Sequence, residues 1–280
     1  MARSVVPGYF GLAAIMLGSI AAAVNMAWWF VAQVPISYQV QYESRMVAEF
    51  MVIQCVSAAL IGLGLIRVYW RGSARSEPEP DRSPLGLVGD VVSSKTAKKV
   101  AILGGLAYAA FYLVASSIVV YQPTVDFSAA YGVTAPTWNI AACCGSYGSI
   151  PMVILYVLPQ LHLGMQIIPL DIILALVIPI LVGINAAVAY SAMRNRPTGA
   201  GLGWFGALGA SVGLFTSCPT CAGLFLASSL GGLGATSLAI SLAPFQAAFI
   251  VVALPVLAIT PVLTAGSVRR TIQSGCKPRE

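Results

Sequence analysis

Two long stretches of the chain contain no charged side chain, and this absence limits the possible folds more than any other feature. Residues 127–170 and 197–268 contain no Asp, Glu, Lys or Arg. Only 9% of the 280 residues are charged, whereas soluble domains carry about 25%. About 20 apolar residues cross a bilayer as a helix, in which the backbone satisfies its own hydrogen bonds. Residues 1–280 are therefore predicted to form one all-α, polytopic membrane domain.

Six apolar segments are long enough to form membrane-spanning helices. The first exceeds the roughly 7–15 residues of a signal-peptide core, so we interpret it as a retained span. Trp28, Trp29 and Phe30 at its far end are typical of the aromatic belt at a membrane surface. The predicted spans cover about residues 9–31, 47–69, 100–121, 169–192, 202–230 and 244–266.

A basic loop and a long apolar segment connect these spans. Residues 70–99 are rich in charge, Pro and Ser, which predicts a partly disordered cytoplasmic loop. Residues 122–168 precede the fourth span, and Pro151, Pro159 and Pro169 cut their second half into short pieces. We expect this segment to stay on the outer side of the membrane, as a re-entrant or interfacial hairpin.

The basic residues predict the orientation of the bundle. With six spans, 14 of the 15 Lys and Arg residues lie on the side of the two termini, and only Arg45 lies opposite. Basic residues accumulate on the cytoplasmic side, so both termini are predicted to be cytoplasmic in a plasma-membrane protein. This distribution accounts for the net charge of +6 without a nucleic-acid partner. The expected partner is the lipid bilayer.

The fifth predicted span carries two thiols in the stretch GLFTSCPTCAGLFL. The i,i+3 spacing of Cys218 and Cys221 puts both sulfurs on one helix face, within reach of a disulfide. Pro219 favours the first position of a restarted helix, where the thiolate of Cys218 would be stabilised. Cys218 is then the expected nucleophile and Cys221 the resolving thiol. The alternative is that both cysteines pack as small apolar side chains.

Two adjacent cysteines, Cys143 and Cys144, lie in the predicted outer segment. Thiols outside a cell tend to oxidise. We therefore expect this pair to bridge internally, to pair with Cys218 or Cys221, or to serve as a structural staple. Of the two remaining cysteines, Cys55 is interpreted as a packing residue and Cys276 as a free thiol in the C-terminal tail.

The outer pair and the membrane CxxC together resemble the layout of the vitamin K epoxide reductases and their bacterial disulfide-forming counterparts. The resemblance implies a membrane thiol–disulfide oxidoreductase in which quinone oxidises Cys218 and Cys221. Cys143 and Cys144 would then pass oxidising equivalents to an extracytoplasmic thiol protein. The layout differs from that family because Cys218 lies near mid-span and because the outer cysteines are adjacent.

A second hypothesis is the transport or delivery of a soft metal ion such as copper. Thiolates and thioethers select Cu(I) over hard cations. The intramembrane Cys-Pro motif resembles the metal relays of mercury and copper transporters, which implies that Cys218 and Cys221 pass on an ion captured outside. His162, the single histidine, and Met165 would contribute to the metal site, with Cys143 and Cys144 also on the outer side. His162 is alternatively a polar interfacial side chain.

A third hypothesis is a non-catalytic subunit or assembly factor of a membrane complex. Gly209 and Gly213 form a small-residue face suited to close helix packing. Asp171 and Glu49 are interpreted as acids in the first turn of a helix, with a proton site as the alternative for both. Four amides are expected to bond across helices, namely Asn25, Gln54, Asn185 and Gln246.

Overall fold

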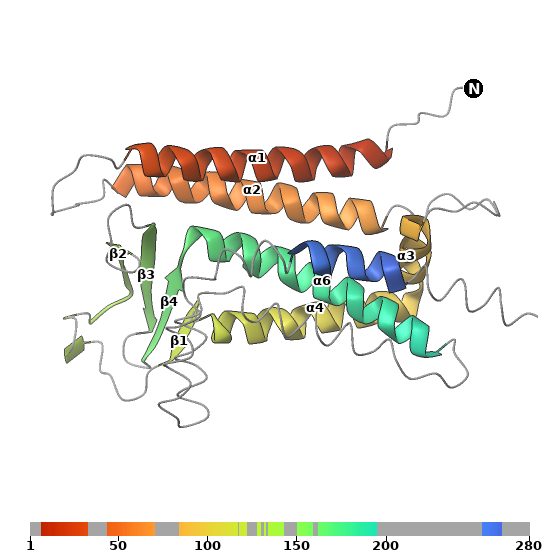
Figure 1. Cartoon of the computed structure of the whole chain (residues 1–280). Coiled ribbons are helices and arrows are strands. Elements are labelled where there is room, and N and C mark those ends of the chain that lie inside the picture. Colours follow the sequence, from red (N-terminus) through yellow and green to blue (C-terminus); the bar gives the residue numbers. More distant parts are fainter. Residues whose placement is uncertain are drawn as a thin grey trace, which may run out of the picture.

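Long helices dominate the computed structural model of the chain, and a small sheet lies at one end of them (Figure 1). The structure describes residues 7–32, 44–70, 84–116, 118–121, 128–129, 132, 134–142, 150–158, 162–194 and 254–264.

Four of the described helices are long and apolar enough to cross a membrane. α1 packs along α2, α4 packs along α6, and α2 joins the two pairs by contacting α6. Three predicted spans are confirmed as helices with bounds that differ by a few residues. The four helices are α1 (Pro7–Ala32), α2 (Ser44–Trp70), α4 (Lys95–Ala115) and α6 (Pro169–Arg194).

The predicted span of residues 100–121 is corrected at both of its ends. α4 begins earlier because Ser94 caps it, accepting a hydrogen bond at Oγ from the Ala97 N–H at 3.3 Å. It ends at Ala115, and the backbone N–H and the hydroxyl of Ser116 both donate to the Tyr112 carbonyl, at 2.8 and 2.6 Å. The β-branched residues that follow form strand β1 (Val119–Tyr121) instead of a further helical turn.

The predicted loop of residues 70–99 contains a helix, α3 (Pro84–Ser93), which lies across one end of the long helices (Figure 1). Pro84 occupies its first position, where the missing N–H costs nothing. Val88 and Val92, four residues apart on one face, are fully buried in the main core. This burial explains why a segment rich in charged and polar neighbours is ordered here.

A four-stranded antiparallel sheet lies at the end of the bundle opposite α3 (Figure 1). No strand was predicted in this segment from the sequence. Its apolar run PMVILYVL is rich in β-branched and aromatic residues, and Pro151 and Pro169 start a strand and a helix rather than interrupting one. The strand order is β1, β4 (Leu163–Ile167), β3 (Pro151–Leu158) and β2 (Thr137–Ala142).

The chain leaves α4 and enters α6 at this same sheet end (Figure 1). β1 follows α4 directly and pairs with β4, which directly precedes α6. The described parts of residues 118–168 therefore form a sheet that returns the chain to its starting end, without a further long helix.

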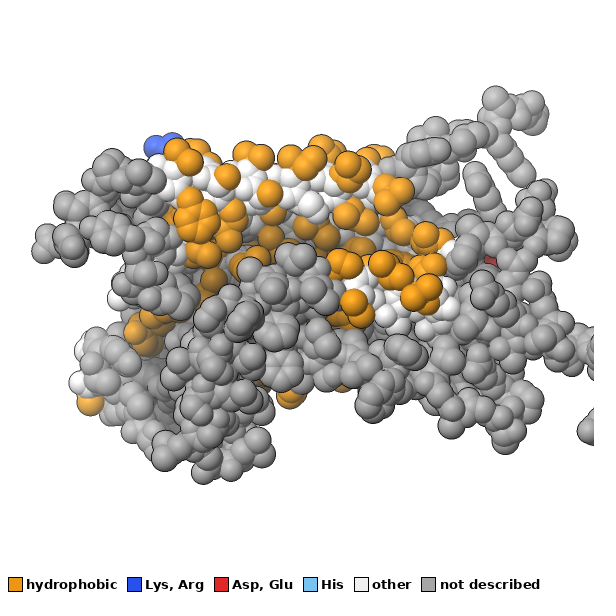
Figure 2. Space-filling model, in the orientation of Figure 1, with side chains coloured by type: hydrophobic (Ala, Val, Ile, Leu, Met, Phe, Trp, Pro, Cys, Tyr) orange, Lys and Arg blue, Asp and Glu red, His pale blue; other side chains and the backbone are white. Residues whose placement is uncertain are grey.

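Apolar side chains both fill the core and cover the outside of the helices (Figure 2). The main core lies between α2, α3, α4, α6 and the short apolar helix Leu254–Thr264. On α1 the exposed apolar residues recur at seven-residue spacing, as in Phe10 (59% exposed), Leu17 (63%) and Val24 (61%). An exterior of this kind suits lipid rather than water, so the fold is that of a membrane protein.

Glycine allows the closest helix contacts. A Cβ atom on Gly183 of α6 would overlap the Ala101 carbonyl oxygen of α4, and one on Gly105 would lie 3.0 Å from the Pro179 carbonyl oxygen. On the other helix pair, a Cβ atom on Gly64 would lie 2.7 Å from the Gly11 carbonyl oxygen. Small residues thus let the backbones of both helix pairs approach closely.

Candidate functional site

The four cysteines of the predicted redox site lie outside the described residues. These are Cys143, Cys144, Cys218 and Cys221, and the predicted helix restart at Pro219 lies outside them too. Cys55 is described, and it is a free thiol exposed on α2 rather than the packing residue that was expected.

The strand that leads to Cys143 and Cys144 packs against the helix bundle. β2 ends at Ala142, the residue before Cys143, and Ala142 pairs with Pro151 at the start of β3. Ile140 and Val153 on these strands pack against the fully buried Trp29 and Phe50 of α1 and α2. Ala142, the residue before Cys143, therefore belongs to a strand pair that packs on α1 and α2 at the sheet end of the bundle.

His162 is a turn residue between β3 and β4. Its φ of 57° lies in the left-handed region, which few residues other than Gly, Asn, Asp and His adopt. Met165 lies in β4, where it pairs with Val119 and Leu155, and its side chain packs against the main core. Both residues thus have a structural role in the sheet.

The register of the sheet places His162 far from Ala142, the residue before Cys143. Ala142 pairs with the first residue of β3, Pro151, whereas the turn with His162 follows the last residue, Leu158. A strand rises about 3.4 Å per residue, so the two positions lie about 24 Å apart along β3. Among the described residues, no three His, Cys, Asp or Glu side chains come together as metal ligands.

Three of the four predicted interhelical amides are confirmed, and Gln246 lies outside the described residues. Asn25 donates to the Phe50 carbonyl at 3.1 Å, and Gln54 donates to the Ala22 carbonyl at 3.4 Å, so α1 and α2 are tied reciprocally. Asn185 donates to the Leu257 carbonyl at 2.9 Å.

Of the two acids that were predicted to lie in the first turn of a helix, one lies there and the other does not. Asp171 does lie in the first turn of α6 and is buried, with 3% of its surface exposed. Glu49 does not lie in a first turn, because α2 already begins at Ser44. It forms an exposed i,i+4 ion pair with Arg45 at 3.1 Å, which contributes at most about 0.5 kcal/mol.

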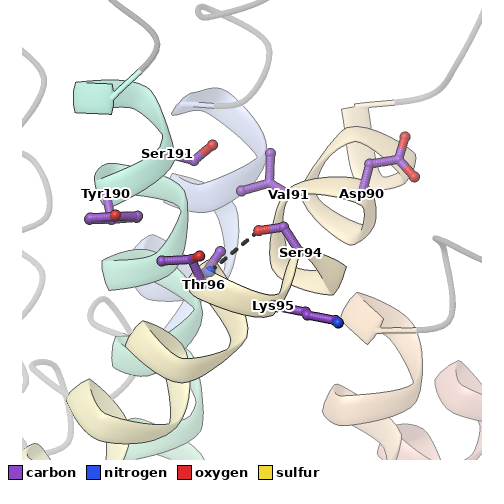
Figure 3. A pocket seen from close by; sticks show the side chains of 8 residues that line it. Asp90, Val91, Ser94, Lys95, Thr96, Tyr190 and Ser191 are labelled. Carbon is purple, nitrogen blue, oxygen red and sulfur yellow. Dashed lines mark hydrogen bonds between the residues drawn. The ribbon is translucent and has the colours of Figure 1, made fainter.

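An open recess that was not predicted from the sequence lies at the opposite end of the bundle, where α3, α4 and α6 meet (Figure 3). Its volume is about 510 Å³, and hydroxyl groups from α4 and α6 face one side of it. The lining combines polar and apolar side chains, and the sequence signal for it was the Ser-Ser-Lys-Thr run of residues 93–96, where α3 ends and α4 begins. The lining residues are Asp90, Val91, Ser94, Lys95, Thr96, Ala97, Tyr190 and Ser191.

The two ends of the bundle differ in charge. Of the six described Lys and Arg residues, Arg45 alone lies near the sheet, at the start of α2. Arg67 lies in the last turn of α2, with its guanidinium carbon 4.8 Å from the Phe10 ring centroid. The other four lie at the ends of α4 and α6 near α3, namely Lys95, Lys98, Lys99 and Arg194.

The fold and this charge distribution define a helical membrane protein with a sheet at one end. Comparison of the chain with family models, with curated proteins and with solved structures finds no match.

Proposed function

We propose that this protein transfers electrons between thiols and disulfides in the plasma membrane. The proposed site consists of Cys218 and Cys221 in the fifth span, with Cys143 and Cys144 as the outer exchange pair. The observation that carries the proposal is the attachment of the outer pair: Cys143 directly follows β2, which is anchored on α1 and α2 at the end of the bundle. A pair held at one end of the helices suits exchange with a partner in solution and with a pair inside the bundle.

The proposed reaction moves two electrons per cycle. A substrate dithiol outside the membrane reduces the Cys143–Cys144 disulfide and is itself oxidised to a disulfide. The resulting thiols then reduce the Cys218–Cys221 disulfide by attack of a thiolate through a mixed disulfide, which restores the outer disulfide. Quinone is the acceptor that the family resemblance implies for the electrons now held as two thiols.

The proposal includes six spans with both termini in the cytoplasm. Its support is electrostatic, because the described basic residues concentrate at the α3 end and the positive side of a membrane protein faces the cytoplasm. The sheet would then lie outside, where an oxidising environment favours disulfides.

Metal transport has less support than electron transfer. The attachment points of His162 and of the outer cysteines lie at opposite ends of β3, and Met165 packs on the core. For these residues to bind one metal ion, the chain after Ala142 would have to extend along the length of β3 to reach His162.

The redox state of the four cysteines in native membranes tests the proposal. Free thiols are alkylated with one reagent, disulfides are reduced and alkylated with a second, and mass spectrometry assigns each cysteine. We expect both pairs to be partly oxidised and the outer pair to become reduced after a membrane-impermeant dithiol is added. In Cys218→Ser the outer pair should stay reduced, whereas Cys55→Ser should behave as the wild type. Four permanently reduced thiols would refute the proposal, and copper that copurifies with the wild type but not with Cys218→Ser would favour metal transport.

A further inference from the structure

Three lysines lie within the first five residues of α4, at the α3 end of the bundle. Lys95, Lys98 and Lys99 are all exposed, and the first turn contains no acidic residue. Asp90 is the one acid among the described residues of α3 and α4. The water-facing end of this helix is therefore a basic cluster.

The basic cluster lies next to the exposed apolar side chains of α4. Residues four positions apart lie on one helix face, so Ile102 follows Lys98 and Leu103 follows Lys99 along the helix surface. Ile102 is 47% exposed and Leu103 is 67% exposed, and Leu106 one turn further on is 62% exposed. Such a stripe faces lipid, which places the lysines at the level of the lipid headgroups.

The three lysines of the basic cluster repel one another. Lys95 repels Lys98 and Lys99, because side chains three and four residues apart are neighbours on a helix. The N-terminal end of a helix also carries a partial positive charge, which disfavours cations there. A negatively charged group in the same layer would offset both the repulsion between the lysines and the unfavourable charge of the helix end.

We infer that Lys95, Lys98 and Lys99 bind the headgroups of anionic phospholipids in the leaflet on the α3 side. The exposed stripe accommodates the acyl chains, and the ammonium groups pair with the phosphates. Each lysine near an anionic membrane surface contributes about 1 kcal/mol, or roughly a five-fold gain in affinity. This inference does not depend on the proposed redox function.

Lipid titration of the purified full-length protein tests the inference. Native mass spectrometry from a neutral detergent would measure the affinity for phosphatidylglycerol and for phosphatidylcholine. We expect phosphatidylglycerol to bind more tightly, and the triple variant K95Q/K98Q/K99Q to lose at least about ten-fold in affinity for it. The single variant Lys99→Gln, expected to lose about five-fold, covers the case in which the triple variant does not fold.

The matched control is Arg45→Gln, which removes an exposed basic residue at the sheet end. It should leave the affinity for phosphatidylglycerol unchanged. Equal binding of both lipids, or lysine variants that bind phosphatidylglycerol like the wild type, would overturn the inference. Full displacement of the lipid by millimolar inorganic phosphate would show that the cluster takes free phosphate, and would overturn the assignment to lipid.

Discussion

Asn185 supplies the hydrogen-bond donor that the Leu257 carbonyl lacks within its own helix. The residue four positions after Leu257 is Pro261, which has no N–H to donate. The Asn185 amide nitrogen lies 2.9 Å from the Leu257 carbonyl oxygen and also donates to Leu181 in its own helix at 2.8 Å. In the next peptide, the Tyr69 hydroxyl donates to the Ala258 carbonyl at 2.7 Å. Side chains of α6 and α2 thus hold the helix Leu254–Thr264 through backbone carbonyls beside a proline.

Asn185→Leu is expected to destabilise the protein by about 0.6–1.7 kcal/mol, because the Leu257 carbonyl would be left without a donor in an apolar surrounding. Unfolding in mixed micelles titrated with sodium dodecyl sulfate, followed by far-ultraviolet circular dichroism, measures the change. The control is the double variant with Pro261→Ala, which restores a backbone N–H to the helix. The cost of Asn185→Leu should fall in that background, and an equal cost in both backgrounds would contradict the compensation.

Gly183→Ala is expected to destabilise the α4–α6 pair by about 1–3 kcal/mol, because the added methyl group would overlap the Ala101 carbonyl oxygen. Gly104→Ala is the matched control on the same interface. Its methyl group would meet only the Ala186 methyl at 3.3 Å, and helix propensity favours alanine by up to about 1 kcal/mol. The same unfolding measurement should separate the two variants clearly, and similar stabilities would show that the helices are less closely packed.

His162→Val is expected to cost about 1–2 kcal/mol, because a β-branched residue disfavours the left-handed backbone at φ 57°. His162→Gly should retain the turn, since glycine adopts this conformation freely. Thermal unfolding of the two variants, monitored by circular dichroism, tests the turn assignment. If His162→Gly and His162→Val lost the same stability, the imidazole itself rather than the backbone conformation would be the important feature.

The sequence predicted the parts of this fold that follow from local pattern. Long apolar segments predicted three of the four long helices within a few residues, and polar residues such as Asn25 in apolar helices predicted interhelical hydrogen bonds. The sheet was missed because an apolar run of eight residues, such as β3, is compatible with a helix piece or a strand. Pairing with β2 and β4 decides between them, and such long-range pairing leaves no local signal.

The candidate site was less predictable for the same reason. Cysteine spacing suggests redox chemistry but does not place the residues relative to each other. The separation of His162 from the end of β2 became visible only with the register of β3. The recess between α3, α4 and α6 depends on the position of α3, which is determined by burial of Val88 and Val92.

The orientation predicts that the two ends of the bundle face opposite sides of the membrane. Ser93 at the end of α3 and Thr137 in β2 are both exposed. With cysteine at these positions, a membrane-impermeant maleimide should label Ser93→Cys only in inside-out vesicles and Thr137→Cys only in right-side-out vesicles. Peptide mass spectrometry identifies the labelled cysteine, so the native cysteines stay in place. Labelling of both from one side would contradict the predicted topology.

Two adjacent tryptophans allow a test of how the sheet is attached. The sequence placed Trp28 and Trp29 together in an aromatic belt, but only Trp28 is exposed, at 45%, whereas Trp29 is fully buried. The Trp29 ring lies 4.7 Å from the Phe50 ring between centroids, and this pair packs against β2 and β3 through Ile140 and Val153. Burial of a side chain depends on which face of α1 packs against the rest of the protein, and the sequence of α1 alone does not show which face that is.

Trp29→Ala is therefore expected to destabilise the protein by about 3–5 kcal/mol, because it leaves a cavity where α1, α2 and the sheet meet. Trp28→Ala, one residue away in the same helix, should change the stability by less than about 1 kcal/mol. Limited proteolysis in detergent locates the effect: Trp29→Ala should expose cleavage sites in residues 137–158 first, because the strands lose their support. Equal losses in both variants, or first cleavage near α3, would show that Trp29 does not anchor the sheet.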